Sequence, residues 1–328
     1  MRNILCVTLI ALLGGCTSTS VTEKYQDKRN DIINVKDKVI EFETGNVLIG
    51  SVSRLYMSNK CLLIAVDKQI HIFNKNDFSY LTSIGNFGEG PEEITVMGCL
   101  AIDEAHHQLY VSDHAKQKIF SYDMDSVMVD SLYKPQVKTA MNETLFPSEY
   151  QYINDTLSIA VLIKPTSTST FNQFLGRWNM NTGEMIPMKY THPDIQKKRI
   201  TFAASEKAGI YVECYTRHDL MTICSLDGEL LYNIYGPDWD GGNGNKLQSF
   251  GTVMIGNDKI FVSYCGEDYA RDSFPTKILV FDLEGNYLKT LETGYKISDC
   301  CYDSFNNRII LSLNDVVQFA YLDIDGII

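Results

Sequence analysis

The sequence predicts an all-β fold, a six-bladed β-propeller with four antiparallel strands in each blade. Three observations predict it: one strand-and-turn unit occurs six times, another strand precedes most copies, and no strand follows the last copy. Each unit is a run of β-branched or aromatic residues that ends in a turn rich in Asn, Asp, Ser and Gly. The six copies are residues 70–77, 119–126, 175–183, 221–228, 278–285 and 318–326.

The first turn residue of each copy gives the spacing of the repeat. These residues, at positions 74, 123, 179, 225, 282 and 323, follow one another at intervals of 41 to 57 residues. Such intervals fit four short strands with their connections, and the alternation in the preceding segments is typical of strands. We interpret the turn carboxylates as structural rather than as a calcium loop, because Asn, Asp and Ser side chains accept hydrogen bonds from the backbone just ahead.

The end of the sequence predicts how the ring closes. Only Ile327 and Ile328 follow Gly326, so the sixth blade lacks its outermost strand. Residues 38–42 stand before the first complete blade and belong to none. Pairing them with residues 317–322 would cover an exposed sheet edge. The sequence therefore predicts a propeller domain at residues 38–328, closed by an N-terminal strand that completes the last blade.

The N-terminus has the pattern of a bacterial signal peptide at residues 1–15. Its apolar stretch is shorter than the roughly 20 residues that a membrane-spanning helix needs. Residues 13–16, Leu-Gly-Gly-Cys, resemble a lipobox, which predicts lipid on Cys16 and attachment of the protein to a membrane. Residues 16–37, rich in Thr, Ser and charge, are expected to be this cysteine and a flexible tether.

The charge of the chain argues against one class of partner. The formal net charge is −12, and it becomes −13 once residues 1–15, whose only charged side chain is Arg2, are removed. An acidic chain repels phosphate backbones. We therefore expect no nucleic acid partner.

The cysteines give no complete disulfide framework. Of nine, Cys6 leaves with the signal peptide and Cys16 is the predicted lipid site, so an odd seven remain. Buried free thiols are expected for these seven. A bridge between Cys214 and Cys224, which would lie nearly opposite in one hairpin, stays open as an alternative. The Cys and His spacings that are typical of metal sites do not occur.

A glycine-rich segment at residues 85–93, Gly-Asn-Phe-Gly-Glu-Gly-Pro-Glu-Glu, lies between two predicted blades, and a looser copy occurs at 235–239. We interpret its Gly and Pro residues as shaping the passage between blades. A phosphate-binding loop is disfavoured because no helix follows and three glutamates would repel the anion.

Through this motif, residues 38–328 resemble the TolB-like six-bladed propeller lipoproteins of Bacteroidetes. The resemblance implies the fold and a location in the cell envelope, with the lipid in the outer membrane, but no activity. Residues 17–22 contain no acidic residue. In that phylum this favours the periplasmic face over the cell surface.

Long connections are predicted on one face of the propeller, at residues 134–147, 164–172, 190–198, 237–249 and 267–275. Insertions on one face of a repeat fold usually mark the binding face. Trp239 suits stacking on a sugar or peptide, because its loop of Gly and Asp offers little core to fill. The candidate ligand-binding or partner-binding residues are His114, Lys116, Arg217, His218, Trp239, Asp240, Asp268, Arg271 and Asp272.

Two functions compete. We favour a binding or scaffold module for an envelope protein, peptide or glycan, with no catalytic residues and no cofactor. The alternative is a calcium-dependent hydrolase that resembles the six-bladed lactonases and needs oxygen ligands converging in the channel. The predicted inner strands offer Asp103, Asn154 and Asp299 for calcium. Arg54 and Arg199 alone do not form an arginine cluster like that of sialidases.

Overall fold

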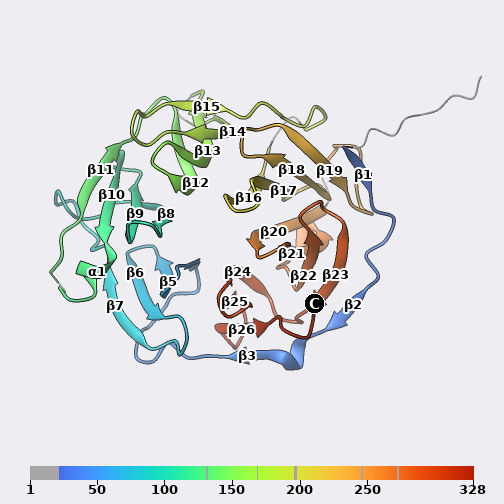
Figure 1. Cartoon of the computed structure of the whole chain (residues 1–328), viewed down its shortest axis with the longest axis horizontal. Helices are drawn as coiled ribbons and strands as arrows, with labels where there is room; N and C mark the ends of the chain where they lie inside the picture. The colour runs from blue at the N-terminus through green and yellow to red at the C-terminus, as the bar shows by residue number, and fades with distance from the viewer. Residues whose placement is uncertain (1–21, 131, 168, 196–197, 245–246, 272) are drawn as a thin grey trace, which may run out of the picture.

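The computed structural model describes residues 22–328 except 131, 168, 196–197, 245–246 and 272. Six sheets, each built on a blade of four antiparallel strands, stand around a central axis, which confirms the predicted six-bladed β-propeller (Figure 1). The predicted signal peptide and Cys16 lie outside the described residues.

Each blade consists of four strands, ordered from the axis outward. Blades 1 to 3 are β4 (Arg54–Met57), β5 (Cys61–Val66), β6 (Gln69–Asn74) and β7 (Tyr80–Ile84); β8 (Met97–Asp103), β9 (Gln108–Asp113), β10 (Lys118–Asp123) and β11 (Gln136–Ala140); and β12 (Phe146–Asn154), β13 (Leu157–Pro165), β14 (Phe171–Trp178) and β15 (Met185–Pro187). Blades 4 to 6 are β16 (Ile200–Ser205), β17 (Ile210–Tyr215), β18 (Leu220–Ser225) and β19 (Leu230–Tyr235); β20 (Leu247–Gly256), β21 (Lys259–Asp268), β22 (Lys277–Asp282) and β23 (Tyr287–Glu292); and β24 (Ile297–Asp303), β25 (Arg308–Leu313), β26 (Phe319–Asp323) and β3 (Val39–Glu41).

The repeated unit of the sequence is the third strand of each blade with the turn that follows it. The Asn74 side chain accepts a hydrogen bond from the backbone of Asn76, and Asp282 accepts one from Glu284. Gly285 closes its turn with a φ of 80°, a conformation that favours glycine. In blade 2 a short helix, α1 (Met124–Val127), replaces the turn.

Ring closure is confirmed. Strand β3 pairs antiparallel with β26, with Ile40 opposite Tyr321. Just beyond β3, the Phe42 ring stacks on Phe78 of blade 1 with ring centroids 3.8 Å apart. The sixth blade therefore combines strands from both ends of the propeller domain.

The prediction of a flexible tether at residues 16–37 is wrong for residues 22–37, the part that the structure describes. Strand β1 (Glu23–Tyr25) pairs parallel with β19, β2 (Ile32–Asn34) pairs parallel with β23, and a 3-10 helix, η1 (Lys36–Lys38), leads into β3. The segment thus follows the outer edges of blades 4, 5 and 6 (Figure 1). Its polar composition suggested disorder, but pairing to a sheet edge uses backbone groups and does not need apolar side chains.

One predicted loop is also wrong. Residues 134–147 contain β11, the outermost strand of blade 2. This strand, Gln-Val-Lys-Thr-Ala, is largely exposed and mostly polar, so it lacks the apolar alternation that identifies a half-buried strand.

The core lies between the blades. Six clusters of buried apolar side chains each join two neighbouring blades, and together they form a continuous ring. All seven cysteines of the described residues are buried free thiols. Cys214 stands opposite Met221 and Cys224 opposite Tyr211, so the two thiols are not paired.

A buried cluster of charges joins blades 1 and 6, the first and last of the ring. The Asp303 carboxylate lies 3.2 Å from Lys75 Nζ and 3.2 Å from Arg308 Nε, and all three side chains are at least nine-tenths buried. The Arg308 guanidinium also lies over the rings of Phe78 and Tyr321, 4.9 and 5.0 Å from their centroids. The seam between the two blades thus depends on one carboxylate that balances two cations.

The variant Asp303→Ala should lose about 3–5 kcal/mol of unfolding free energy, because it leaves two buried cations without a counter-ion. Urea unfolding measures this. Asp125→Ala is a matched control, since its contacts with Lys60 at 3.4 Å and His107 at 2.6 Å are both exposed, and it should change stability by less than about 1 kcal/mol. Equal losses of unfolding free energy in the two variants would contradict a stabilising role for this charge cluster.

The same carboxylate predicts sensitivity to acid. Burial by itself would raise the pKa of Asp303, but the hydrogen bonds from Asn306 and the charge of Lys75 together lower it. Its contribution to stability is therefore fully present above the ordinary aspartate pKa near 4 and is lost as pH falls through the lowered folded-state pKa. Acid unfolding of Asp303→Ala should show a correspondingly weaker pH dependence than the parent chain.

Candidate functional site

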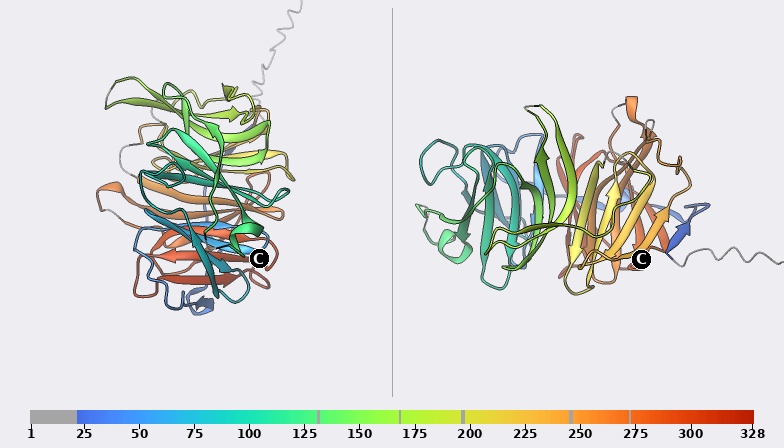
Figure 2. Two further views of the ribbon diagram at one scale, coloured as in Figure 1. Left: turned by 90° about the vertical axis from the view of Figure 1, so that its left-hand side faces the viewer. Right: turned by 90° about the horizontal axis from the view of Figure 1, so that it is seen from above.

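A cavity of about 1070 Å³ lies on the propeller axis. The inner strands of all six blades line it, together with residues from the connections between blades and between second and third strands. Those connections share one face of the ring, here called the long-loop face. The hairpins β13–β14 and β21–β22 project from it, the latter with a short 3-10 helix, η2 (Tyr269–Arg271) (Figure 2).

The far end of the cavity is mostly apolar. Each inner strand begins at the long-loop face and runs toward a tight turn, and near that turn it places one half-buried side chain against the cavity. We call these six residues the collar; they are Met57, Ile102, Tyr152, Ala204, Ile255 and Tyr302.

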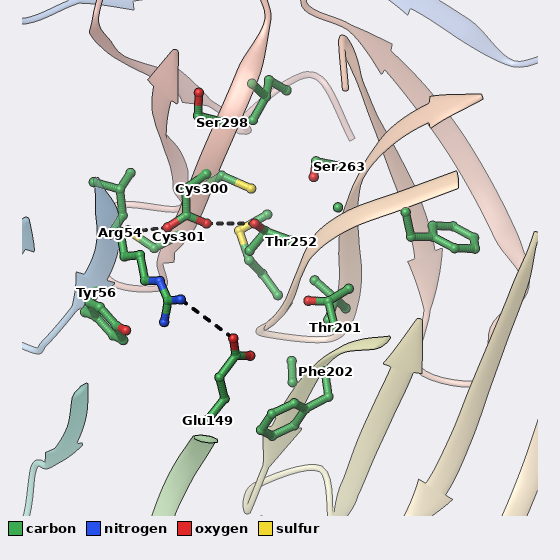
Figure 3. Close-up of a pocket in the computed structure, with 18 of the residues that line it drawn as sticks. Arg54, Tyr56, Glu149, Thr201, Phe202, Thr252, Ser263, Ser298, Cys300 and Cys301 are labelled. Carbon is green, nitrogen blue, oxygen red and sulfur yellow. Dashed lines mark hydrogen bonds and ion pairs between the residues drawn. The ribbon is translucent and has the colours of Figure 1, made fainter. Parts of the chain in front are cut away.

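The half of the cavity near the long-loop face is polar. Arg54 of β4 in blade 1 and Glu149 of β12 in blade 3 point into it toward each other (Figure 3). Their closest charged atoms, Arg54 Nη2 and Glu149 Oε1, are 3.9 Å apart, and about half of each side chain is exposed. This is a loose ion pair whose members remain open to solvent.

Asp299 of β24 also lines the cavity, but its carboxylate is already occupied. It accepts hydrogen bonds from the backbone N–H of Leu55 at 2.8 Å and from Thr252 Oγ1 at 2.7 Å. The three residues belong to blades 6, 1 and 5. Burial raises the pKa of this carboxyl group. Asp299 therefore ties three blades together at the wall of the cavity.

The other two predicted calcium ligands do not converge with Asp299. Asp103 ends β8 and hydrogen-bonds the backbone and ring of His106 and the Tyr110 hydroxyl, an arrangement that Asp303 repeats with Asn306. Asn154 accepts bonds from Thr156 in another tight turn. Within the described part of the chain, no group of three or more His, Cys, Asp or Glu side chains is placed to hold a metal ion. The predicted ligand set therefore does not fit calcium.

Two of the predicted binding residues on the long-loop face, His114 and Lys116, contact the backbone of neighbouring segments. The His114 ring packs against Gly98, where a Cβ would lie 2.4 Å from its Nε2 atom. Lys116 Nζ donates to the carbonyl groups of Gly90 and Glu93. Lys116 thus holds the glycine-rich junction between blades 1 and 2, as the structural interpretation of that motif predicts.

Trp239 is half-buried and does not line the cavity. Its ring packs on Tyr235, His192 and His218, with centroid distances of 5.0, 5.7 and 5.9 Å. Asp240, beside it, lies 3.7 Å from His218 and accepts a bond from the backbone of Gly244. Burial lowers the pKa of His218, so the neutral ring is favoured. This cluster anchors residues 237–244 to blade 4.

The remaining candidates lie on or beside the hairpin β21–β22. The Arg217 guanidinium lies over the Tyr269 ring, with its central carbon 3.7 Å from the ring centroid, and both residues line the cavity. Asp268 accepts a bond from the backbone of Ala270, and Arg271 pairs with Glu267 at 3.2 Å near the tip. Asp272 lies outside the described residues. Of the sequence-predicted binding residues, Arg217 is the one at the cavity mouth.

Comparison with known proteins agrees on the fold. A family model described as a 6-bladed beta-propeller matches residues 17–173. A solved structure of a duf4221 family member from Bacteroides vulgatus is 10% identical and has a TM-score of 0.62, over 90% of this chain and 98% of that one. A "putative exported protein" from Bacteroides fragilis is 12% identical, with a TM-score of 0.59 over 92% and 98% of the two chains.

A more distant likeness is to the β-propeller domain of Cps50 (Swd1) from Myceliophteria thermophila, which is 10% identical with a TM-score of 0.53 over 84% and 98% of the chains. At these identities the structures show the fold alone. No curated protein matches the chain in sequence. Together the matches support a propeller family.

Among the described residues, no helix is long and apolar enough to cross a membrane.

The role of Asp299 can be tested by two substitutions. Asp299→Ala should cost about 1–3 kcal/mol of unfolding free energy, because the Leu55 N–H and the Thr252 hydroxyl lose their acceptor. Asp299→Asn keeps an oxygen for Leu55 and should be close to neutral. Because the folded-state pKa is raised, the parent chain should lose stability relative to Asp299→Asn as pH rises from about 4 through that pKa. Urea unfolding as a function of pH measures this, and a constant difference would contradict it.

Proposed function

We propose that the chain is a lipid-anchored binding protein of the bacterial cell envelope, and that its ligand or partner docks on the long-loop face at the mouth of the axial cavity. One observation carries the proposal: the cavity of about 1070 Å³ holds charged side chains, Arg54 and Glu149, that are half exposed. Ligand sites are concave and combine apolar walls with a few convergent polar groups.

The rim of the cavity supports docking of a larger partner. Leu48, Val52 and Val316 are 97%, 74% and 100% exposed on the long-loop face where blades 6 and 1 meet. Gln318 ties these loops together by donating to the carbonyl groups of Ile49 and Gly50. Across the mouth stand Tyr269 and Arg217, residue types that are enriched at binding hot spots. Exposed apolar side chains beside a polar cavity are typical of an interaction surface.

The envelope location rests on the N-terminal sequence and on a relative. The signal-peptide pattern, the lipobox at residues 13–16 and the likeness to TolB-like lipoproteins favour lipid on Cys16, in the outer membrane and on its periplasmic face. The Bacteroides fragilis neighbour, described as exported, agrees with an envelope location. An envelope protein, a peptide or a glycan is the proposed partner class, and the acidic net charge disfavours nucleic acid.

Lipidation predicts a labelling result. Cells of a lipoprotein-processing host that express the chain and are fed radioactive palmitate should label it, and Cys16→Ala should abolish the label because the acylated thiol is gone. Cys6→Ala is the control, since that cysteine lies within the predicted signal peptide. Label retained in Cys16→Ala would contradict the anchor.

If the partner docks on the long-loop face, replacing an exposed aromatic residue there should reduce partner binding, whereas replacing one on the opposite face should not. After crosslinking in the native envelope, Tyr269→Ala should recover its partner at least about 10-fold less well, because hot-spot aromatics contribute roughly 2 kcal/mol or more. Phe305→Ala is the matched control, because Phe305 is 80% exposed on the opposite, tight-turn face. Equal recovery by the two variants, with parent-like melting temperatures, would refute the proposed face.

A further inference from the structure

Three arginines from separate elements line the axial cavity of a chain whose formal net charge is −12. Arg54 begins β4 in blade 1, Arg199 lies just before β16, and Arg217 lies between β17 and β18. The acidic side chains of the lining are Glu149 and Asp299. Three cations and two carboxylates give the lining a formal excess of one positive charge, opposite in sign to the rest of the protein.

The two carboxylates do not neutralise these arginines. Both oxygens of Asp299 accept hydrogen bonds from Leu55 and Thr252. Glu149 stands 3.9 Å from Arg54, well beyond the roughly 2.8 Å of a good charge-assisted hydrogen bond. An arginine fork with a distant, half-exposed counter-ion retains donors for another acceptor.

The other two arginines add donors at the rim. Among the described residues, neither Arg199 nor Arg217 has a carboxylate within 4.0 Å. The contact of Arg217 with the Tyr269 ring restrains the guanidinium group at the rim without using its N–H donors. A planar, oriented guanidinium edge suits bidentate recognition of a planar anion.

We propose that the cavity binds its ligand through a single carboxylate held by Arg54, with Arg199 and Arg217 guiding it at the rim, and with an apolar portion of the ligand directed toward the collar. This inference rests on the proposed function and gives that site a ligand chemistry. The single excess positive charge matches a monoanion, whereas Glu149 and Asp299 would repel a doubly charged phosphate.

The carboxylate could belong to the C-terminus of a peptide or to an acidic sugar. The collar, with Met57, Ile102 and Ile255 among its members, offers apolar contacts that suit a peptide ending in apolar residues better than a sugar chain. Peptide and sugar probes distinguish the two sources.

The test is calorimetric titration of the full chain in detergent with acetyl-Ala-Ala-Phe, with its C-terminal amide, and with monomeric galacturonic acid. The acid peptide should bind at least about 10-fold more tightly than the amide, as expected for a charge-assisted bond. Arg54→Ala should abolish that preference. Arg271→Ala is the matched control, because Arg271 lies on the same face and pairs with Glu267, and it should leave the preference intact.

For a second variant we expect the opposite change in affinity for the acid peptide. Glu149→Gln removes the carboxylate beside Arg54 and should tighten binding of the acid peptide several-fold, with little effect on the amide. This variant keeps the test decisive if Arg54→Ala does not fold. Thermal melting of each variant reports its folding.

Several results would overturn the inference: equal binding of acid and amide, a preference that survives in folded Arg54→Ala, or no binding of any carboxylate probe at about 10 mM, where complexes with millimolar Kd are occupied. If the sugar acid alone bound, and its binding required Arg54, recognition of a carboxylate would be supported. The apolar portion of the proposed ligand would then be contradicted. Failure of the proposed function is a separate result. It would appear in the crosslinking experiment as undiminished recovery of the partner by Tyr269→Ala.

Discussion

The closure of the ring is the constraint on which the rest of the structure depends. Strand β3 supplies the outermost strand of blade 6, and Phe42 immediately after it stacks on Phe78 of blade 1. The charges of Lys75, Asp303 and Arg308 fill the same seam. Because every blade buries its apolar faces against its neighbours, an open seam would expose the apolar faces of blades 6 and 1. Closure therefore completes the sixth interblade core.

The axial cavity is a product of that closure. Its walls come from six inner strands that never meet in sequence, and Asp299 bonds to blades 1 and 5 across two interblade boundaries. A rigid ring can hold Arg54 and Glu149 in a loose pair at 3.9 Å, because neither residue's strand is free to move toward the other. The scaffold thus keeps charged groups exposed that a more flexible chain would bring together. Such preorganisation is what a binding site requires.

The fold was predictable from sequence because the third strand and its turn repeat with the same chemistry in each blade, and because residues 38–42 form a segment that belongs to no complete blade. The site was less predictable. Asp103 was a candidate ligand because a carboxylate at the end of an inner strand resembles one in the channel, yet it caps a tight turn. Glu149 and Tyr269 gave no sequence signal, since their importance comes from strands distant in sequence that meet at the axis. The polar residues 23–34 resembled a tether because backbone pairing has no side-chain signature.

The N-terminal segment has a consequence for the order in which the chain can fold. Strands β1, β2 and β3 are synthesised before their partners, which lie in blades 4, 5 and 6, and the closing pair of Ile40 and Tyr321 is separated by about 280 residues. Contacts of such long range slow folding. Because they precede their partners in the chain, these strands must stay unpaired during synthesis until most of the domain has been made. Their short length and polar composition limit aggregation during that delay.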